Sequence, residues 1–307
     1  MNLYTKVTTN QLTTLINHKE QGLIMGSCFA GVVGRRLSET AFKVTVNPLG
    51  VMFNPASIAM ALDHIQNGHH YSQQELIFHN GMWHSPFHHG SFSGVSAEKV
   101  LEIINRPQPT HYKYMVLTLG TAYIYERTGV VVANCHKMPA TEFTQRMLSV
   151  EQVRQMITDI AHRNPQTNII LSVSPVRHLG DGLTENCLSK AILRVAVAQV
   201  CAQNSNCHYF PAYEIMVDEL RDYRFYDRDM VHPSPQAEDI VWERFLNCCV
   251  DKKSTDFYNH VAQALSDKAH RPLHPESPEY QNFKKATQQR IELLKKEFPD
   301  VDFSKVF

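Results

Sequence analysis

Two short segments, about two hundred residues apart, carry side chains that could perform nucleophilic catalysis. In Met25-Gly26-Ser27-Cys28-Phe29-Ala30, a hydroxyl and a thiol follow the short apolar stretch 22–25. In Asp229-Met230-Val231-His232-Pro233, a carboxylate and an imidazole are three positions apart. A thiol or hydroxyl with a histidine base and an orienting carboxylate suits covalent acyl transfer. The segments therefore predict a nucleophile–His–Asp site, provided that the fold brings them together.

Either Ser27 or Cys28 could be the nucleophile. We expect their segment to be a turn between a strand and a helix, because residues 30–38 have a helical pattern. The N-terminus of a helix lowers the pKa of a thiol and stabilises nearby negative charge. The alternative is that Cys28 is a small buried side chain, as free cysteines commonly are.

Asp229 and His232 have the spacing of one helical turn, which would let the carboxylate hold the tautomer of the imidazole. The same pattern also fits a solvated turn, and Asp227 is a competing carboxylate. Pro233 and a predicted helix from about residue 236 favour a loop that enters a helix.

Strand-like and helix-like stretches alternate along the chain. Apolar or β-branched runs predict five strands, at residues 22–25, 42–46, 114–119, 168–173 and 207–211. Helices are predicted at residues 30–38, 55–66, 149–163 and 186–203. This order predicts right-handed crossovers and a mostly parallel sheet between helices.

Ligands of such sheets bind beyond the carboxyl ends of the strands. The residues expected at those ends are Ser27, Cys28, Asn47, Gly50, Gly120, Thr121, Ser174, Arg177 and His178. A fixed guanidinium at Arg177 would suit a carboxylate, a phosphate or a sugar hydroxyl. The alternative for Arg177 is an ion pair with an acidic helix residue.

Two segments do not fit the repeat. Residues 69–110 are polar, aromatic and rich in histidine, including His88 and His89, and we expect an insertion over the strand ends. It could be a substrate-binding wall or a lid packed by its own side chains; no spacing there fits a metal site. Residues 251–307 predict a helical C-terminal extension, with a charged helix at about 280–298, after a main domain of residues 1–250.

Composition restricts the class of protein. Of 307 residues, 30 are Lys or Arg and 30 are Asp or Glu, and no basic stripe predicts binding to nucleic acid or to a membrane surface. No apolar run is long enough for a transmembrane helix, and no signal peptide is expected at the N-terminus. Seven cysteines without a CxxC pair predict reduced thiols and a cytoplasmic protein. We expect no cofactor and leave homo-oligomerisation open.

Over about residues 20–245 the chain resembles the GSCFA family, which is related to the SGNH (GDSL-like) hydrolases. The resemblance is carried by five motifs in order: Gly26-Ser27-Cys28-Phe29-Ala30, Asn47-Pro48-Leu49-Gly50-Val51, Leu119-Gly120-Thr121-Ala122, Ser174-Pro175-Val176-Arg177-His178 and Asp229-Met230-Val231-His232-Pro233-Ser234. It implies an SGNH-hydrolase-like fold: a flavodoxin-like, three-layer α/β/α arrangement around a mostly parallel five-stranded sheet. Aligning the glycines places Cys28 in the nucleophile position of the G-x-S turn, whereas a shift of one residue places Ser27 there. Asp229 and His232 match the D-x-x-H motif.

The sequence departs from the SGNH pattern at the G-x-N-D block. Its asparagine, which donates to the oxyanion hole, is replaced by Ala122. Losing one such donor typically costs about 100- to 1,000-fold in rate. Thr121, Asn47 or Asn54 could substitute, and Gly50 matches the glycine that donates its backbone N–H.

The resemblance implies an esterase that removes an O-acyl group, by analogy O-acetyl, from a carbohydrate or similar polyol. Cys28 or Ser27 would attack, His232 would take the proton and Asp229 would orient it. The expected oxyanion and substrate contacts are Gly50, Asn54, Gly120, Thr121, Arg177, His178, His88 and His89. Acyl transfer by the same site, and a non-catalytic carbohydrate- or partner-binding module, are the alternatives.

Overall fold

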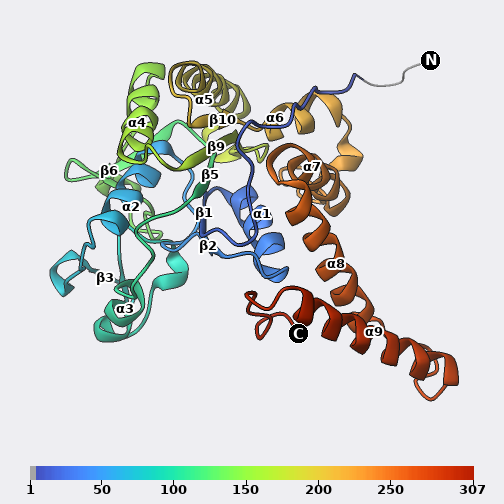
Figure 1. Cartoon of the computed structure of the whole chain (residues 1–307). Coiled ribbons are helices and arrows are strands. Elements are labelled where there is room, and N and C mark those ends of the chain that lie inside the picture. The colour runs from blue at the N-terminus through green and yellow to red at the C-terminus, as the bar shows by residue number, and fades with distance from the viewer. Residues whose placement is uncertain (1–4) are drawn as a thin grey trace.

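A five-stranded parallel sheet forms the centre of the protein, whose computed structural model describes residues 5–307 (Figure 1). In sheet order, the strands are β10 (Cys207–Tyr209), β9 (Asn168–Val173), β5 (Tyr114–Leu119), β1 (Gly22–Gly26) and β2 (Val44–Val46). Every neighbouring pair is parallel, so the predicted α/β class and all five predicted strands are confirmed.

The register aligns the carboxyl ends of the three central strands. Gly26 at the end of β1 pairs with Thr118 of β5, and Leu119 at the end of β5 pairs with Val173 at the end of β9. All residues of these three strands are buried, which explains their continuous apolar runs. The segments that follow the strands therefore begin side by side at one sheet edge.

Helices cover both faces of the sheet (Figure 1). One layer consists of α2 (Pro55–Gln66), α4 (Val150–Arg163) and α5 (Leu183–Gln203). The other consists of α1 (Cys28–Glu39), the short α6 (Ala212–Glu214) with a π-helical turn, Ile215–Glu219, and α7 (Pro235–Cys249). Side chains alternate along β1, so that Leu23 and Met25 join the first layer's core and Ile24 joins the second.

The C-terminal region packs on the second layer. It consists of α8 (Lys252–Ala269) and α9 (Pro278–Glu297), which matches the predicted helix at 280–298. Phe257 of α8 and Ile291 of α9 belong to the same apolar cluster as α1 and α7. The turn between α8 and α9 projects away from the body of the protein (Figure 1).

Two small additions lie outside the central sheet. The histidine-rich insertion contains the hairpin of β3 (Ile77–His79) and β4 (Met82–His84), followed by α3 (Ala97–Ile104), with an apolar cluster of its own. An antiparallel sheet of β6 (Tyr123–Arg127), β7 (Val130–Val132) and β8 (Thr144–Met147) follows β5 and was not predicted. The sequence feature that indicates the β6–β7 hairpin is the two-residue turn Thr128-Gly129, in which both residues have positive φ.

Within residues 5–307, no helix combines the length and apolarity that a membrane crossing requires. The same residues contain no group of three or more histidine, cysteine or acidic side chains placed to hold a metal ion.

Candidate active site

Residues 25–30 include a glycine, Gly26, at which any side chain would clash with the backbone of β5. Gly26 ends β1 with φ +136°, and a Cβ added there would lie 2.1 Å from the backbone oxygen of Thr118. The backbone therefore passes very close to β5 before α1 begins. Ser27 is the N-cap of α1, and Cys28 is its first residue.

Ser27 faces the interior. Its side chain is 2% exposed, and its Oγ lies 2.9 Å from the Oγ1 of Thr118. Its N–H also donates to Thr118, at 3.1 Å to the backbone oxygen and 3.0 Å to Oγ1. The Ser27 hydroxyl is thus part of the joint between β1 and β5.

Cys28 faces a cavity instead. It is partly exposed and lines a space of about 30 Å³ together with His232. The fold therefore brings together the early thiol and the late imidazole. Burial raises the pKa of the Cys28 thiol above its usual value, and this outweighs the opposite effect of the residue's own backbone N–H. The expected lowering by the helix N-terminus is therefore present but smaller than the effect of burial, so the thiol is protonated at neutral pH.

Asp229 holds His232 in a defined orientation. Asp229 Oδ2 lies 2.6 Å from His232 Nδ1, while Oδ1 accepts the backbone N–H groups of Val231, at 2.9 Å, and His232, at 3.0 Å. These contacts, above all the N–H of His232, lower the pKa of Asp229 to about 2. The carboxylate assigns the proton to Nδ1, which leaves Nε2 able to accept one.

The two residues lie in a loop rather than on the helical turn that their spacing suggested. Met230 between them has φ +58°, which a helix does not allow. The base of the loop is closed by two hydrogen bonds, from Asp227 N–H to the oxygen of His232 and from Ser234 N–H to that of Phe225, both 2.8 Å. The competing carboxylate, Asp227, instead accepts the N–H of Arg228.

Arg177 supports this loop. Its guanidinium lies 4.4 Å from the ring centre of Tyr226 and 5.6 Å from that of Tyr223. It also donates to the Tyr226 hydroxyl, at 3.1 Å, and to the backbone oxygen of Met230, at 3.3 Å. The alternative, an ion pair with an acidic residue, is not formed within residues 5–307, and these two donors are directed to the loop that carries His232. Substrate binding by Arg177 stays a prediction.

Several expected oxyanion donors are already engaged. The N–H of Gly50 donates to the oxygen of Asn47 at 2.7 Å, so it closes a turn. Thr121 Oγ1 lies 3.1 Å from Ser189 Oγ and accepts the N–H of Tyr123 at 3.1 Å. Ala122 is completely buried in the core, so an asparagine at that position could not face the site. Gly50 and Thr121 are therefore not available as we expected.

Two asparagines keep unused donors. Asn47 Oδ1 accepts the N–H of Gly26 at 2.9 Å, and Asn54 Oδ1 caps α2 by accepting the N–H of Ser57 at 2.8 Å. In both cases the oxygen is engaged and, among the described residues, the side-chain NH₂ has no acceptor. Phe53, next to Asn54, accepts the N–H groups of Gly120 and Thr121, which anchors this loop at the end of β5.

His178 lies at the same edge. Its Nε2 would be 3.0 Å from a Cβ added to Gly120, and its ring packs edge-on against Phe53 with centres 5.4 Å apart. Burial lowers its pKa to about 4, with smaller contributions from the charges of Lys190 and His232. The imidazole is neutral at pH 7, and no hydrogen bond within residues 5–307 uses its ring nitrogens.

Lys190 was missed by the sequence analysis. This residue of α5 is 1% exposed, and its Nζ donates to the backbone oxygens of Gly120, at 2.6 Å, and Ser174, at 2.7 Å. It therefore joins the carboxyl ends of β5 and β9. The only signal was a lysine within the apolar pattern of a helix, where such residues are seldom buried unless paired.

We expect Lys190 to make stability depend on pH. Burial lowers its pKa from 10.5 to about 7, so between these values the unfolded chain binds a proton that the folded protein does not. The free energy of unfolding should consequently rise with pH from about 7 to 10.5, by at most about 1.4 kcal/mol per unit from this group. Denaturant unfolding of the wild type and Lys190→Met across this range measures the contribution as the difference in slope.

The matched control is Lys284→Met on the exposed surface of α9, which should leave the wild-type slope unchanged. Lys190→Met should also lower stability at every pH, because the oxygens of Gly120 and Ser174 lose their donor. Equal slopes for the wild type and Lys190→Met would contradict the assignment.

The histidines of the insertion pack mainly among themselves. His88 is 1% exposed, with Nδ1 2.8 Å from Ser85 Oγ and its ring against Tyr71, and burial lowers its pKa to about 3. The backbone N–H of His89 donates to the oxygen of Leu49, and its Cβ packs over Gly50. The structure thus places His88 among side chains of the insertion itself and His89 at the edge of the Gly50 turn.

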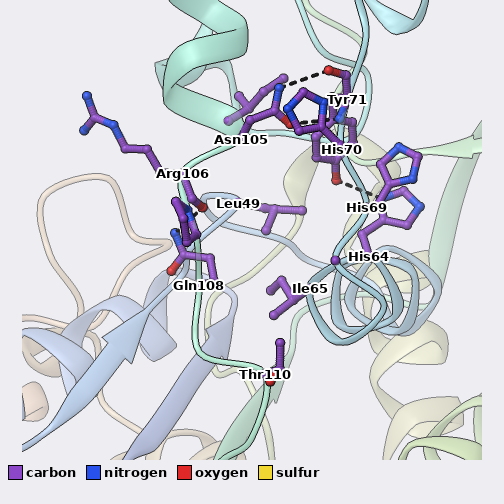
Figure 2. Close-up of a pocket in the computed structure, with 13 residues that line it drawn as sticks. Leu49, His64, Ile65, His69, His70, Tyr71, Asn105, Arg106, Gln108 and Thr110 are labelled. Atoms are coloured by element: carbon purple, nitrogen blue, oxygen red, sulfur yellow. Dashed lines mark hydrogen bonds between the residues drawn. The ribbon is translucent and has the colours of Figure 1, made fainter.

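A larger cavity, of about 280 Å³, lies between this insertion and α2 (Figure 2). Figure 2 shows the His64 ring and the Tyr71 hydroxyl directed toward each other, and their atoms are 2.8 Å apart. Neither Cys28 nor His232 lines this cavity. The thiol and the imidazole therefore share the smaller cavity and not this one.

Comparison with known proteins shows which protein families and solved structures the chain matches. The model of the GSCFA family matches residues 22–245, and that of the "GSCFA domain protein, C-terminal domain" matches residues 261–307. No curated protein matches the chain. A solved structure described as "a putative platelet activating factor from Streptococcus pneumonia" aligns with a TM-score of 0.38 and 10% identity, over 74% of this chain and 82% of that one.

Proposed function

This chain belongs to the GSCFA family, and on that basis we propose that it is a carboxylic ester hydrolase of the SGNH type with Cys28 as nucleophile. The observation that carries the proposal is the shared cavity of Cys28 and His232, with Asp229 2.6 Å behind the imidazole. A nucleophile, a base and a group that orients the base are the parts of a covalent acyl-transfer site. The substrate we propose is an O-acyl ester of a carbohydrate or similar polyol.

The first half of the reaction forms a thioester. His232 Nε2 takes the proton of Cys28 while Sγ bonds to the ester carbonyl carbon, whose π electrons move to oxygen. The backbone N–H of Cys28 and the free amide of Asn54 or Asn47 would donate to this oxyanion, with neutral His178 as a further donor. Collapse breaks the bond to the alcohol oxygen, which receives its proton from His232.

The second half consumes water. His232 removes a proton from the water, the oxygen of which bonds to the thioester carbon, and cleavage of the carbon–sulfur bond returns the proton to Cys28. The side chain of His232 is 45% exposed, so water can reach the imidazole. This exposure favours hydrolysis over transfer to another acceptor, which requires water to be excluded.

The proposed nucleophilic thiol also indicates the cellular compartment in which the protein works. None of the seven cysteines forms a disulfide, and a free thiol persists in a reducing compartment. We therefore propose that the protein works in the cytoplasm.

The test is an assay of purified protein with p-nitrophenyl acetate and with an acetylated sugar. We expect release of p-nitrophenol and of acetate, with a burst that corresponds to the acyl-enzyme. Mass spectrometry of the acid-quenched protein should locate the acyl group on the peptide that contains Cys28. A protein that binds the sugar ester but releases no acid and carries no acyl group would be the non-catalytic module instead.

A further inference from the structure

The small cavity beside the nucleophile is built by facing sides of two helices. On α1, Cys28 and Val32 are one turn apart; on α7, Glu238 and Val241 are three residues apart and share a face. The helices are joined by ion pairs, Arg36 to Asp239 at 2.5 Å and Arg35 to Glu238 at 3.9 Å. The two helices that line the cavity are thus also joined to each other by charged side chains.

The walls of this cavity are almost entirely apolar. Phe29 of α1, the Pro175–Val176 segment after β9 and Pro233 complete the lining around Val32 and Val241. The space measures about 30 Å³. One water-sized sphere occupies about 10–15 Å³ by this measure, whereas sites for drug-sized ligands hold about 300–1,000 Å³. The cavity has room for a methyl or ethyl group and none for a sugar ring.

We propose that this cavity is the acyl pocket of the enzyme and that Val32, Val241 and Glu238 restrict it to neutral acyl groups of two or three carbons. The inference rests on the proposed function, since it assigns a part of the substrate to a part of the same site. It identifies the substrate class as acetyl or propionyl esters from the dimensions of the pocket.

The chemistry favours the acyl group over the alcohol as occupant. His232 must give a proton to the leaving oxygen, and its ring is nearly half exposed, so the alcohol can extend into solvent. A large polyol is accommodated only on that open side. The small apolar space next to Cys28 remains for the carbon chain that stays bound in the thioester.

Glu238 adds selection by charge. Its side chain is 25% exposed, and it is the only acidic residue that lines the cavity. An acyl group that ends in a carboxylate, such as succinyl, would place a second negative charge beside Glu238, whose ion pair with Arg35 has the long distance of 3.9 Å. Neighbouring like charges disfavour binding, so neutral acyl groups are selected.

The experiment compares p-nitrophenyl acetate, butyrate and hexanoate with the wild type and with Val241→Ala and Val32→Ala. We expect wild-type kcat/KM to fall steeply after acetate. Each alanine variant should raise the hexanoate-to-acetate ratio by at least about tenfold, because one methylene in a pocket is worth about 10- to 200-fold in discrimination. Val241 is buried and Val32 is only partly so, which provides a second variant if the first is poorly folded.

The matched control is Val195→Ala on α5, a valine that is 47% exposed and should leave the ratio unchanged. A second series keeps the acetyl group and varies the alcohol, and the variants should not alter its order. In a third comparison, Glu238→Gln should improve kcat/KM for a p-nitrophenyl monosuccinate relative to the acetate.

The outcomes separate the pocket from the function. A wild type that hydrolyses no ester would overturn the proposed function itself. An active wild type with equal kcat/KM from acetate to hexanoate, or alanine variants with the wild-type ratio, would overturn the acyl pocket and leave the esterase. Variants that change the order of alcohols instead would show that the cavity holds the leaving group.

Discussion

Replacing Cys28 with alanine should lower kcat for ester hydrolysis by on the order of 10⁶-fold, as the loss of a triad nucleophile does. Ser27→Ala should stay within about tenfold of the wild type. Ser27 Oγ is 2.9 Å from Thr118 Oγ1 and 2% exposed, so its removal costs one internal hydrogen bond, or about 0.5–1.5 kcal/mol. Steady-state rates with p-nitrophenyl acetate measure both effects.

The Cys28→Ser variant should be measured beside Cys28→Ala and Ser27→Ala. It keeps a nucleophilic atom at the start of α1 but replaces a thiol with a more weakly acidic hydroxyl, so we expect a rate between those of the wild type and Cys28→Ala. The acyl group trapped on the wild type should be absent from Cys28→Ala and present on Ser27→Ala. Thermal unfolding of each variant shows whether a lost rate reflects a lost fold.

The opposite pattern would contradict the assignment. If Ser27→Ala were inactive and Cys28→Ala remained active, the hydroxyl would have to leave Thr118 to reach the substrate. The joint between β1 and β5 would then open during the reaction.

His232→Ala should be about as damaging as Cys28→Ala, because the two residues act as a unit. Burial keeps the pKa of the Cys28 thiol above its usual value, so the thiol has no thiolate to use without a base. Asp229→Asn should cost about 10⁴-fold, since the amide no longer holds the imidazole in the required tautomer. Rates of ester hydrolysis for both variants test this directly.

A second measurement does not depend on any substrate. Iodoacetamide should alkylate Cys28 more slowly in His232→Ala than in the wild type at neutral pH. The difference should shrink as the pH rises toward the raised pKa of the thiol, where thiolate forms without help. The matched control is His260→Ala on the exposed side of α8, which should change neither rate.

The pH profile of the wild type provides a further check. The pKa of Asp229 is held at about 2, so this carboxylate is ionised throughout the working range and should not produce an acid limb above about pH 3. If Asp229→Asn retained full activity, or if His232→Ala reacted with iodoacetamide as fast as the wild type, the proposed base would be wrong.

The central sheet could be predicted because the hydrophobic patterns of its strands directly reflect how those strands are buried. The runs at residues 114–119 and 168–173 are apolar throughout because both faces of β5 and β9 are covered, and each became a strand with the same bounds. The β6–β7 hairpin was missed because its strands are short and one face is solvated. Its turn at Thr128 and Gly129 was nevertheless visible in the sequence.

The site was foreseen in part for a similar reason. A glycine-led turn and an Asp-x-x-His loop each use neighbours in the chain, and the Asp229–His232 contact spans three residues. The contacts of Gly50 and Arg177 were not foreseen, because their partners could not be inferred from neighbouring residues. Gly50 closes a turn on Asn47, and Arg177 reaches a loop about fifty residues later in the chain.

The sequence by itself determined the strands of a parallel α/β protein, its family and the two segments that carry a thiol, an imidazole and a carboxylate. Only the tertiary structure decided that Ser27 turns inward to Thr118 while Cys28 lines a cavity with His232, and that Lys190 joins the ends of β5 and β9. The physical reason is that local sequence patterns indicate which secondary structure a segment forms. The direction and ionisation of a side chain depend on partners and burial supplied by distant parts of the chain.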